Sequence, residues 1–158
     1  MNWQEVCANS NLKNLPFKIE LNEYGQVVMS PMKVFHSLLQ GEIERLLLRC
    51  ITNGKAFPEC AIHTSKGTKV ADVVWVSDER LQHIKHETEC SIAPEICIEV
   101  LSDSNTEKEM LDKKQLYFQQ LAQEFWLCDQ QGNMRFFNLD NELAHSELLP
   151  DFPVRIDV

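Results

Sequence analysis

The sequence has no apolar run of the length that a membrane-spanning helix requires, which argues against a helical membrane protein. Its first residues, MNWQEVCANSNLKNLPF, lack the basic start and the apolar centre of a signal peptide, so we expect a cytosolic protein. Repeats, low-complexity tracts and linkers are absent as well. The 158 residues, 44% of them hydrophobic, therefore predict a single domain over residues 1–158, with about 1–15 loosely ordered.

Positive charge is also scarce, because 15 Lys and Arg stand against 24 Asp and Glu, a formal net charge of −9. Nonspecific coating of nucleic acid depends on Lys and Arg that neutralise phosphates, so this balance excludes that class of protein. Any contact with nucleic acid must come from a local basic patch, including one completed by oligomerisation.

The six cysteines lack the paired spacing of a disulfide framework, which is typical of a reducing compartment. Cys50, Cys97 and Cys128 lie in apolar runs, where a thiol acts as a small hydrophobic group. His83, His86 and Cys90 stand in an order that suits zinc, but no second pair of ligands accompanies them.

The hydrophobic periodicity changes several times along the chain and predicts helices layered on a mixed sheet. A helix, three strands, a crossover helix that Ser104 or Asn105 caps, and a further strand predict α/β layering with a right-handed crossover after Glu99. The expected strands are two within 17–30 joined by a turn at 23–25, then 59–64, 70–77, 94–102, 124–129, 133–138 and 153–158; the expected helices are 33–51 and 106–121, with a helical turn near 78–84.

Two predicted strands carry carboxylates where apolar residues are expected. Glu99, in PEICIEVLS, shares a strand face with Cys97 and Leu101, although ionised carboxylates are seldom buried without a partner. Asp72 is the only carboxylate within the apolar strand VADVVWVS. If these strands are neighbours, Asp72 and Glu99 come together.

The two helices add charges on their apolar sides. On a helical projection of residues 33–51, Glu42 falls within the apolar arc and Glu44 points away from it. In the crossover helix, Lys114 lies near the middle of the apolar arc and Lys113 lies towards one edge. A lysine on a core-facing stripe either snorkels or has an acidic partner.

Inward carboxylates with one lysine are what metal-assisted phosphodiester hydrolysis requires. The oxygens hold Mg²⁺ or Mn²⁺, the metal acidifies a water molecule and neutralises the phosphate, and the ammonium stabilises the charge on the phosphate oxygens. Carboxylates alone predict only a metal site.

Three blocks, ADVVWV, PEICIEVLSDSNTEKEMLDKKQLYF and EFWLCDQQGNMRFF, resemble in this order the Uma-type family of putative restriction endonucleases. This family is a branch of the PD-(D/E)xK nuclease superfamily and is often abundant in cyanobacteria. The similarity spans most of the chain, including GQVVMSP and His36. It implies a restriction-endonuclease-like αβββαβ core, here an α/β (α+β) fold with an N-terminal β-hairpin and extra C-terminal strands, and Mg²⁺-dependent cleavage of DNA.

The resemblance also implies roles for individual residues. The acidic residue of the family's PD strand falls on Asp72, the Glu of its EVLS motif on Glu99, and its helical lysine on Lys113, whereas the projection favours Lys114. For the Glu that the superfamily's first helix often contributes, the projection selects Glu42. The expected metal ligands are Asp72, Glu99 and the carbonyl of Val100.

The chain departs from the family pattern at Ala71 and Asp103, which stand where proline is usual, and at Leu101, where the superfamily normally has its lysine. An alternative stays open, in which a catalytically silent nuclease fold acts as a binding or dimerisation module; the acidic balance and the absence of an obvious basic groove favour it. A homodimer is expected, since cleavage of two DNA strands needs two sites.

Overall fold

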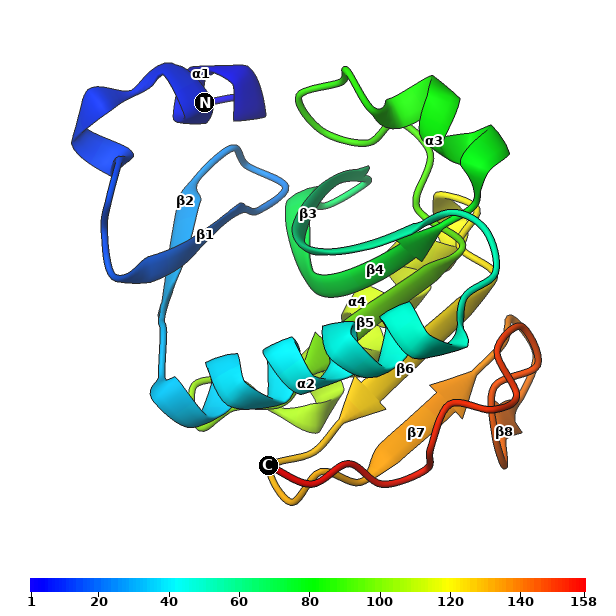
Figure 1. The fold of residues 1–158 in the computed structure, drawn as a ribbon. Coiled ribbons are helices and arrows are strands. Elements are labelled where there is room, and N and C mark those ends of the chain that lie inside the picture. The colour runs from blue at the N-terminus through cyan, green and yellow to red at the C-terminus, as the bar shows by residue number, and fades with distance from the viewer.

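The computed structural model describes all 158 residues, whose strands form a two-stranded hairpin and a six-stranded sheet (Figure 1). In the larger sheet the strands follow the order β3-β4-β5-β6-β7-β8, and only β5 and β6 are parallel. No helix has both the length and the hydropathy to cross a bilayer. The elements are α1 (Trp3–Ala8), a 3₁₀ turn (Ser10–Leu12), β1 (Phe17–Leu21), β2 (Val27–Pro31), α2 (Val34–Cys50), β3 (Lys55–Thr64), β4 (Gly67–Val76), α3 (Asp78–Ile84), β5 (Ile96–Val100), α4 (Glu107–Gln119), β6 (Glu124–Cys128), β7 (Met134–Phe137) and β8 (Glu142–Leu143).

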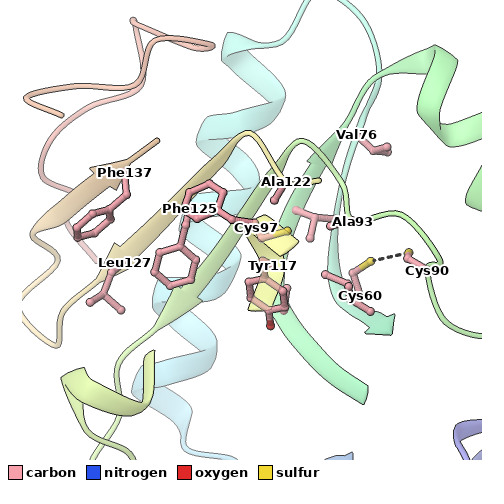
Figure 2. Packing of buried hydrophobic residues seen from close by; sticks show 14 of the residues in the cluster. Cys60, Val76, Cys90, Ala93, Cys97, Tyr117, Ala122, Phe125, Leu127 and Phe137 are labelled. Carbon is pink, nitrogen blue, oxygen red and sulfur yellow. Dashed lines mark hydrogen bonds between the residues drawn. The ribbon is translucent and has the colours of Figure 1, made fainter. Parts of the chain in front are cut away.

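The two faces of the six-stranded sheet carry separate hydrophobic cores, because successive side chains of a strand point to opposite faces. On one face, Leu39, Ile43 and Leu47 of α2 pack against Ile96 and Ile98 of β5 with their neighbours. On the other face, α3 and α4 cover a core that contains Cys97, Tyr117, Phe125 and Phe137 (Figure 2). The fold therefore has three layers, with the sheet in the middle.

The expected αβββαβ core is confirmed, since α2, β3, β4, β5, α4 and β6 follow one another in this order. The hairpin of β1 and β2 precedes the core, and β7 and β8 extend the sheet beyond β6. The Asn53-Gly54 turn follows α2, as predicted. Gly54 has a φ of +77°, and a Cβ there would lie 2.1 Å from the Val76 carbonyl oxygen, so this turn requires glycine.

Two details correct the sequence prediction. Residues 153–158 form no strand; one bridge joins Arg155 to Asn133, and the short β8 pairs with β7 instead. The cap of α4 is Thr106, because its hydroxyl accepts from the Glu109 N–H while the Glu109 carboxylate accepts from the Thr106 N–H. Residues 1–15 contain α1, whose start has the same kind of capping box and whose Val6 is buried.

The site lies where β4 and β5 diverge and the hairpin of β1 and β2 approaches β4. Pairing between β4 and β5 ends at Val73 and Ile98, so the first half of β4 has no partner on that side. There β1 approaches β4 instead: the Glu20 carboxylate accepts from the Val70 N–H at 2.6 Å, and the Lys69 ammonium donates to the Leu21 carbonyl at 3.0 Å. Charged side chains of β1 can therefore reach the gap between β4 and β5.

Candidate active site

Asp72 lies at the point where β4 and β5 separate, and its side chain is 1% exposed. Because β4 no longer pairs with β5 there, the Val100 N–H has no backbone partner on β4, and it donates to Asp72 Oδ2 at 2.8 Å. His36 Nε2, from α2, lies 3.3 Å from the same oxygen. Lys18 Nζ, from β1, donates to Oδ1 at 3.0 Å.

Glu99 lies opposite on β5 and is equally buried. Its Oε1 accepts a hydrogen bond of 2.7 Å from the Tyr117 hydroxyl and lies 3.4 Å from Lys113 Nζ, both from α4. Its Oε2 lies 3.5 Å from Lys18 Nζ. One ammonium, that of Lys18, therefore contacts both strand carboxylates.

Asp72 and Glu99 differ in pKa because their surroundings differ. Burial disfavours the charge of Asp72, but Lys18, His36 and the Val100 N–H together hold the pKa of Asp72 well below its usual range. For Glu99, burial is the largest influence and Asp72 adds repulsion, so its pKa rises to about 7 although Lys113 and Lys18 oppose the rise. Near neutral pH, Asp72 is ionised and Glu99 titrates.

The same charges also shift the pKa values of Lys18 and His36. Burial lowers the pKa of Lys18, but Asp72 and Glu99 outweigh it, and the net pKa lies well above the usual value. For His36, burial also lowers the pKa, and the hydrogen bond and charge of Asp72 produce a net rise. Lys18 therefore stays protonated beside the two carboxylates.

Glu20 connects the hairpin to the helical lysine. Its Oε2 accepts from Lys113 Nζ at 2.8 Å as well as from the Val70 N–H, so Lys113 bridges Glu20 and Glu99. Although burial opposes ionisation, Lys113 and Lys18 lower the pKa of Glu20. The hairpin therefore supplies both a cation and an anion to the site.

A cavity of about 240 Å³ opens beside these residues and contacts Asp72, Lys18, Glu20 and Lys113. Its other side is formed mainly by α2, β2 and the loop after β5. Neutral hydrogen-bonding groups dominate that side, and they include Ser30, Ser37, Gln40, Ser102, Ser104 and Asn105. Such a wall suits a polar ligand.

Of the residues singled out from the sequence, Asp72, Glu99 and Lys113 come together. Lys114 does not: its Nζ lies 4.7 Å from the centre of the Phe137 ring, in a cation–π contact. Glu42 does not either, because it pairs with Arg45 on the same helix. The projection is thus corrected for α2, where Glu44 rather than Glu42 lines the cavity.

Sequence reasoning missed the contributions of Lys18, Glu20 and Tyr117. Lys18 and Glu20 alternate with apolar residues in FKIEL, a pattern that equally fits a solvent-facing hairpin. Tyr117 follows Lys113 by four residues, a spacing that places both side chains on one face of a helix. That spacing was the available signal for Tyr117, and the hairpin offered none.

Asp72 and Glu99 are the groups that could hold a divalent cation. No group of three or more His, Cys, Asp or Glu side chains is arranged to hold a metal. Two carboxylates still fit Mg²⁺ or Mn²⁺, since such ions usually keep several waters and take one or two carboxylates with substrate phosphate. The Lys18 ammonium shows that the position between the carboxylates already holds a cation.

A family model and a solved structure match this chain. The family model Uma2, described as "Putative restriction endonuclease", matches residues 6–152. The crystal structure of a "putative nuclease belonging to DUF820" from Anabaena variabilis superposes with a TM-score of 0.73 at 18% identity, covering 93% of this chain and 85% of the other. At that identity the likeness shows the fold. No curated protein matches the chain.

Proposed function

The chain belongs to the Uma2 family of "Putative restriction endonuclease" proteins, and from this premise we propose that it is an endonuclease that hydrolyses phosphodiester bonds of DNA with a divalent cation. The observation that carries the proposal is the convergence of Asp72 and Glu99 on one cation position beside a cavity. Apolar packing does not require two buried acids at this point, and burial, with a smaller repulsion from Asp72, raises the pKa of Glu99 to about 7.

The charge of the cavity favours a requirement for metal. Its wall contains the acidic residues Asp72, Glu20, Glu44 and Glu59, against the basic residues Lys18, Lys113 and His36. A phosphodiester entering this site meets more negative than positive charge, and an added divalent cation reverses that balance. Mg²⁺ and Mn²⁺ both accept oxygen ligands, so the carboxylates select neither of them.

In this proposal Asp72 and Glu99 hold the cation, with the Val100 carbonyl as a further oxygen ligand. When bound, the cation acidifies a water molecule, the nucleophile, and neutralises the phosphate. Lys113, fixed by Glu20, directs its ammonium to the cavity, where it stabilises negative charge that develops on phosphate oxygens. His36 and the Val100 N–H hold the Asp72 carboxylate in one orientation.

A second candidate is a catalytically silent module that binds a partner or dimerises. The observation that favours it is that Lys18 and Lys113 already neutralise the two strand carboxylates, as they would in a purely structural ion network. In the nuclease proposal, a homodimer would bring two sites to the two strands of DNA.

The deciding experiment combines metal titration with plasmid nicking on the same samples. Mn²⁺ and Mg²⁺ are titrated into the wild type, Asp72→Ala and Glu99→Ala, and each sample is then assayed on supercoiled plasmid. We expect metal binding and nicking in the wild type and neither in the variants. A wild type that binds no metal, with variants that change only in stability, supports the silent module instead.

A further inference from the structure

The four carboxylate oxygens of Asp72 and Glu99 divide into two kinds. Asp72 Oδ2 is held by the Val100 N–H at 2.8 Å and His36 at 3.3 Å, and Glu99 Oε1 is held by Tyr117 at 2.7 Å and Lys113 at 3.4 Å. The remaining oxygens, Asp72 Oδ1 and Glu99 Oε2, have a single partner. That partner is Lys18 Nζ, at 3.0 Å and 3.5 Å.

Lys18 therefore stands where a divalent cation would bridge the two strands. Apart from Lys18, no donor contacts Asp72 Oδ1 or Glu99 Oε2, so these are the oxygens available to a metal, whereas the other oxygen of each carboxylate is anchored. Mg²⁺ binds oxygen at about 2.1 Å, closer than an ammonium does, and two cations cannot share one small buried space.

We propose that Lys18 and the divalent cation compete for Asp72 Oδ1 and Glu99 Oε2, so that metal binding displaces the Lys18 ammonium. This inference rests on the proposed function, because it assumes that these carboxylates bind metal. In the metal-free protein, Lys18 relieves the repulsion between Asp72 and Glu99 and keeps the site assembled. The same contact lowers the affinity for metal.

The position of Lys18 permits such an exchange. Its side chain is 15% exposed and lines the cavity, so its ammonium can leave the carboxylates without crossing a packed core. Lys18 comes from the hairpin rather than from the α/β core that carries Asp72 and Glu99. Its displacement therefore leaves the backbone pairing of β4 and β5 intact.

Calorimetric titration of Mn²⁺ into the full chain, after removal of bound metal with a chelator, tests the competition. Lys18→Met should bind Mn²⁺ about tenfold more tightly than the wild type, because a competing positive charge is lost. Lys69→Met is the matched control: it removes a nearby lysine whose ammonium bonds the Leu21 carbonyl, and its affinity should stay within about twofold. Adding Asp72→Asn to Lys18→Met should abolish the gain.

Two outcomes overturn the inference, and they differ in what they say of the proposed function. If Lys18→Met binds Mn²⁺ no more tightly than a wild type that binds metal and nicks DNA, only the competition is wrong. If neither protein binds Mn²⁺, both proposals fail. Should Lys18→Met not fold, Lys18→Gln keeps a hydrogen-bond donor without the charge. Its affinity should rise in the same direction, and Mn²⁺ should raise its melting temperature more than that of the wild type.

Discussion

Two neighbouring strands of the sheet each carry a fully buried glutamate, and the two glutamates are held in opposite ways. Glu124 on β6 accepts hydrogen bonds from the Trp126 indole at 2.8 Å, the Ser146 hydroxyl at 2.7 Å and the N–H groups of Glu147 and Leu148 at 3.0 and 2.8 Å. All four donors are neutral, and three of them come from the segment after β8, which Glu124 thereby fastens to β6.

Glu99 on β5 has a different set of partners. One neutral donor, Tyr117, makes a short bond, and the other two partners are ammonium groups at 3.4 and 3.5 Å. A second carboxylate, Asp72, shares one of these ammonium groups. Burial alone does not identify a functional acid, because both glutamates are buried; what distinguishes them is that neutral donors hold Glu124, whereas lysine ammonium groups beside a cavity contact Glu99.

The largest difference between Glu99 and Glu124 is expected when each is replaced by glutamine in turn. Glu99→Gln should lower plasmid nicking by about a hundredfold or more, because a metal ligand and its charge are lost. Glu124→Gln should leave the nicking rate of folded protein unchanged. It should lower the free energy of unfolding by about 1–3 kcal/mol, since its amide group would face backbone N–H donors.

Nicking rates and urea unfolding of both variants provide the measurement, and each variant serves as the control for the other. Loss of nicking in well-folded Glu124→Gln would contradict the structural role of Glu124. Retention of nicking in Glu99→Gln would remove Glu99 from the proposed chemistry.

The sequence predicted the strand half of the site because that half depends on local periodicity. Asp72 and Glu99 interrupt apolar strands, and strands that follow each other in an α/β pattern are often neighbours. Glu124 begins its strand and did not stand out, so the sequence could not reveal that it is buried as well.

The rest of the site depends on placement that periodicity does not encode. The pattern of FKIEL does not predict that the hairpin lies against the unpaired half of β4. The place of Lys18 and Glu20 in the site could therefore not be predicted from the sequence. The error at Glu42 has a different cause. A helical projection gives angles but not the direction of the cavity, which Glu44 faces while Glu42 pairs with Arg45.

A pH series measures how much the ionisation of buried Glu99 lowers the free energy of unfolding. Its folded pKa of about 7 lies above the ordinary value of 4.5, so its contribution to stability is complete below pH 4.5 and is lost as pH rises through 7. Relative to Glu99→Gln, the wild type should lose on the order of 3 kcal/mol between these limits. Because the pKa of Asp72 is lowered, Asp72 stays ionised throughout.

Urea unfolding of metal-free wild type and Glu99→Gln from pH 5 to pH 8 measures this difference. His36 has a raised pKa, so its contribution is also lost as pH rises, but it is present in both proteins. A stability difference that stays constant over the range would show that Glu99 does not titrate there.

Removing an ammonium partner of Glu99 should have a smaller effect than removing the acid. Lys113→Met should lower nicking by about tenfold, because charge near the phosphate is lost while the metal ligands remain. Its helix and its contact with Glu20 place the ammonium at the cavity wall, so binding of Mn²⁺ should persist. Nicking at the wild-type rate would show that Lys113 serves only to neutralise Glu20 and Glu99.

Lys114 offers the matched control, since it is the next residue of α4 and also contacts the core. Its ammonium lies over the Phe137 ring rather than beside a carboxylate of the site. Lys114→Met should therefore keep the wild-type nicking rate and lower the free energy of unfolding by about 0.5–1 kcal/mol, the usual strength of such a contact. If Lys114→Met instead reduces nicking and Lys113→Met does not, α4 rotates when substrate binds. The helical projection, which favours Lys114, would then describe the active arrangement.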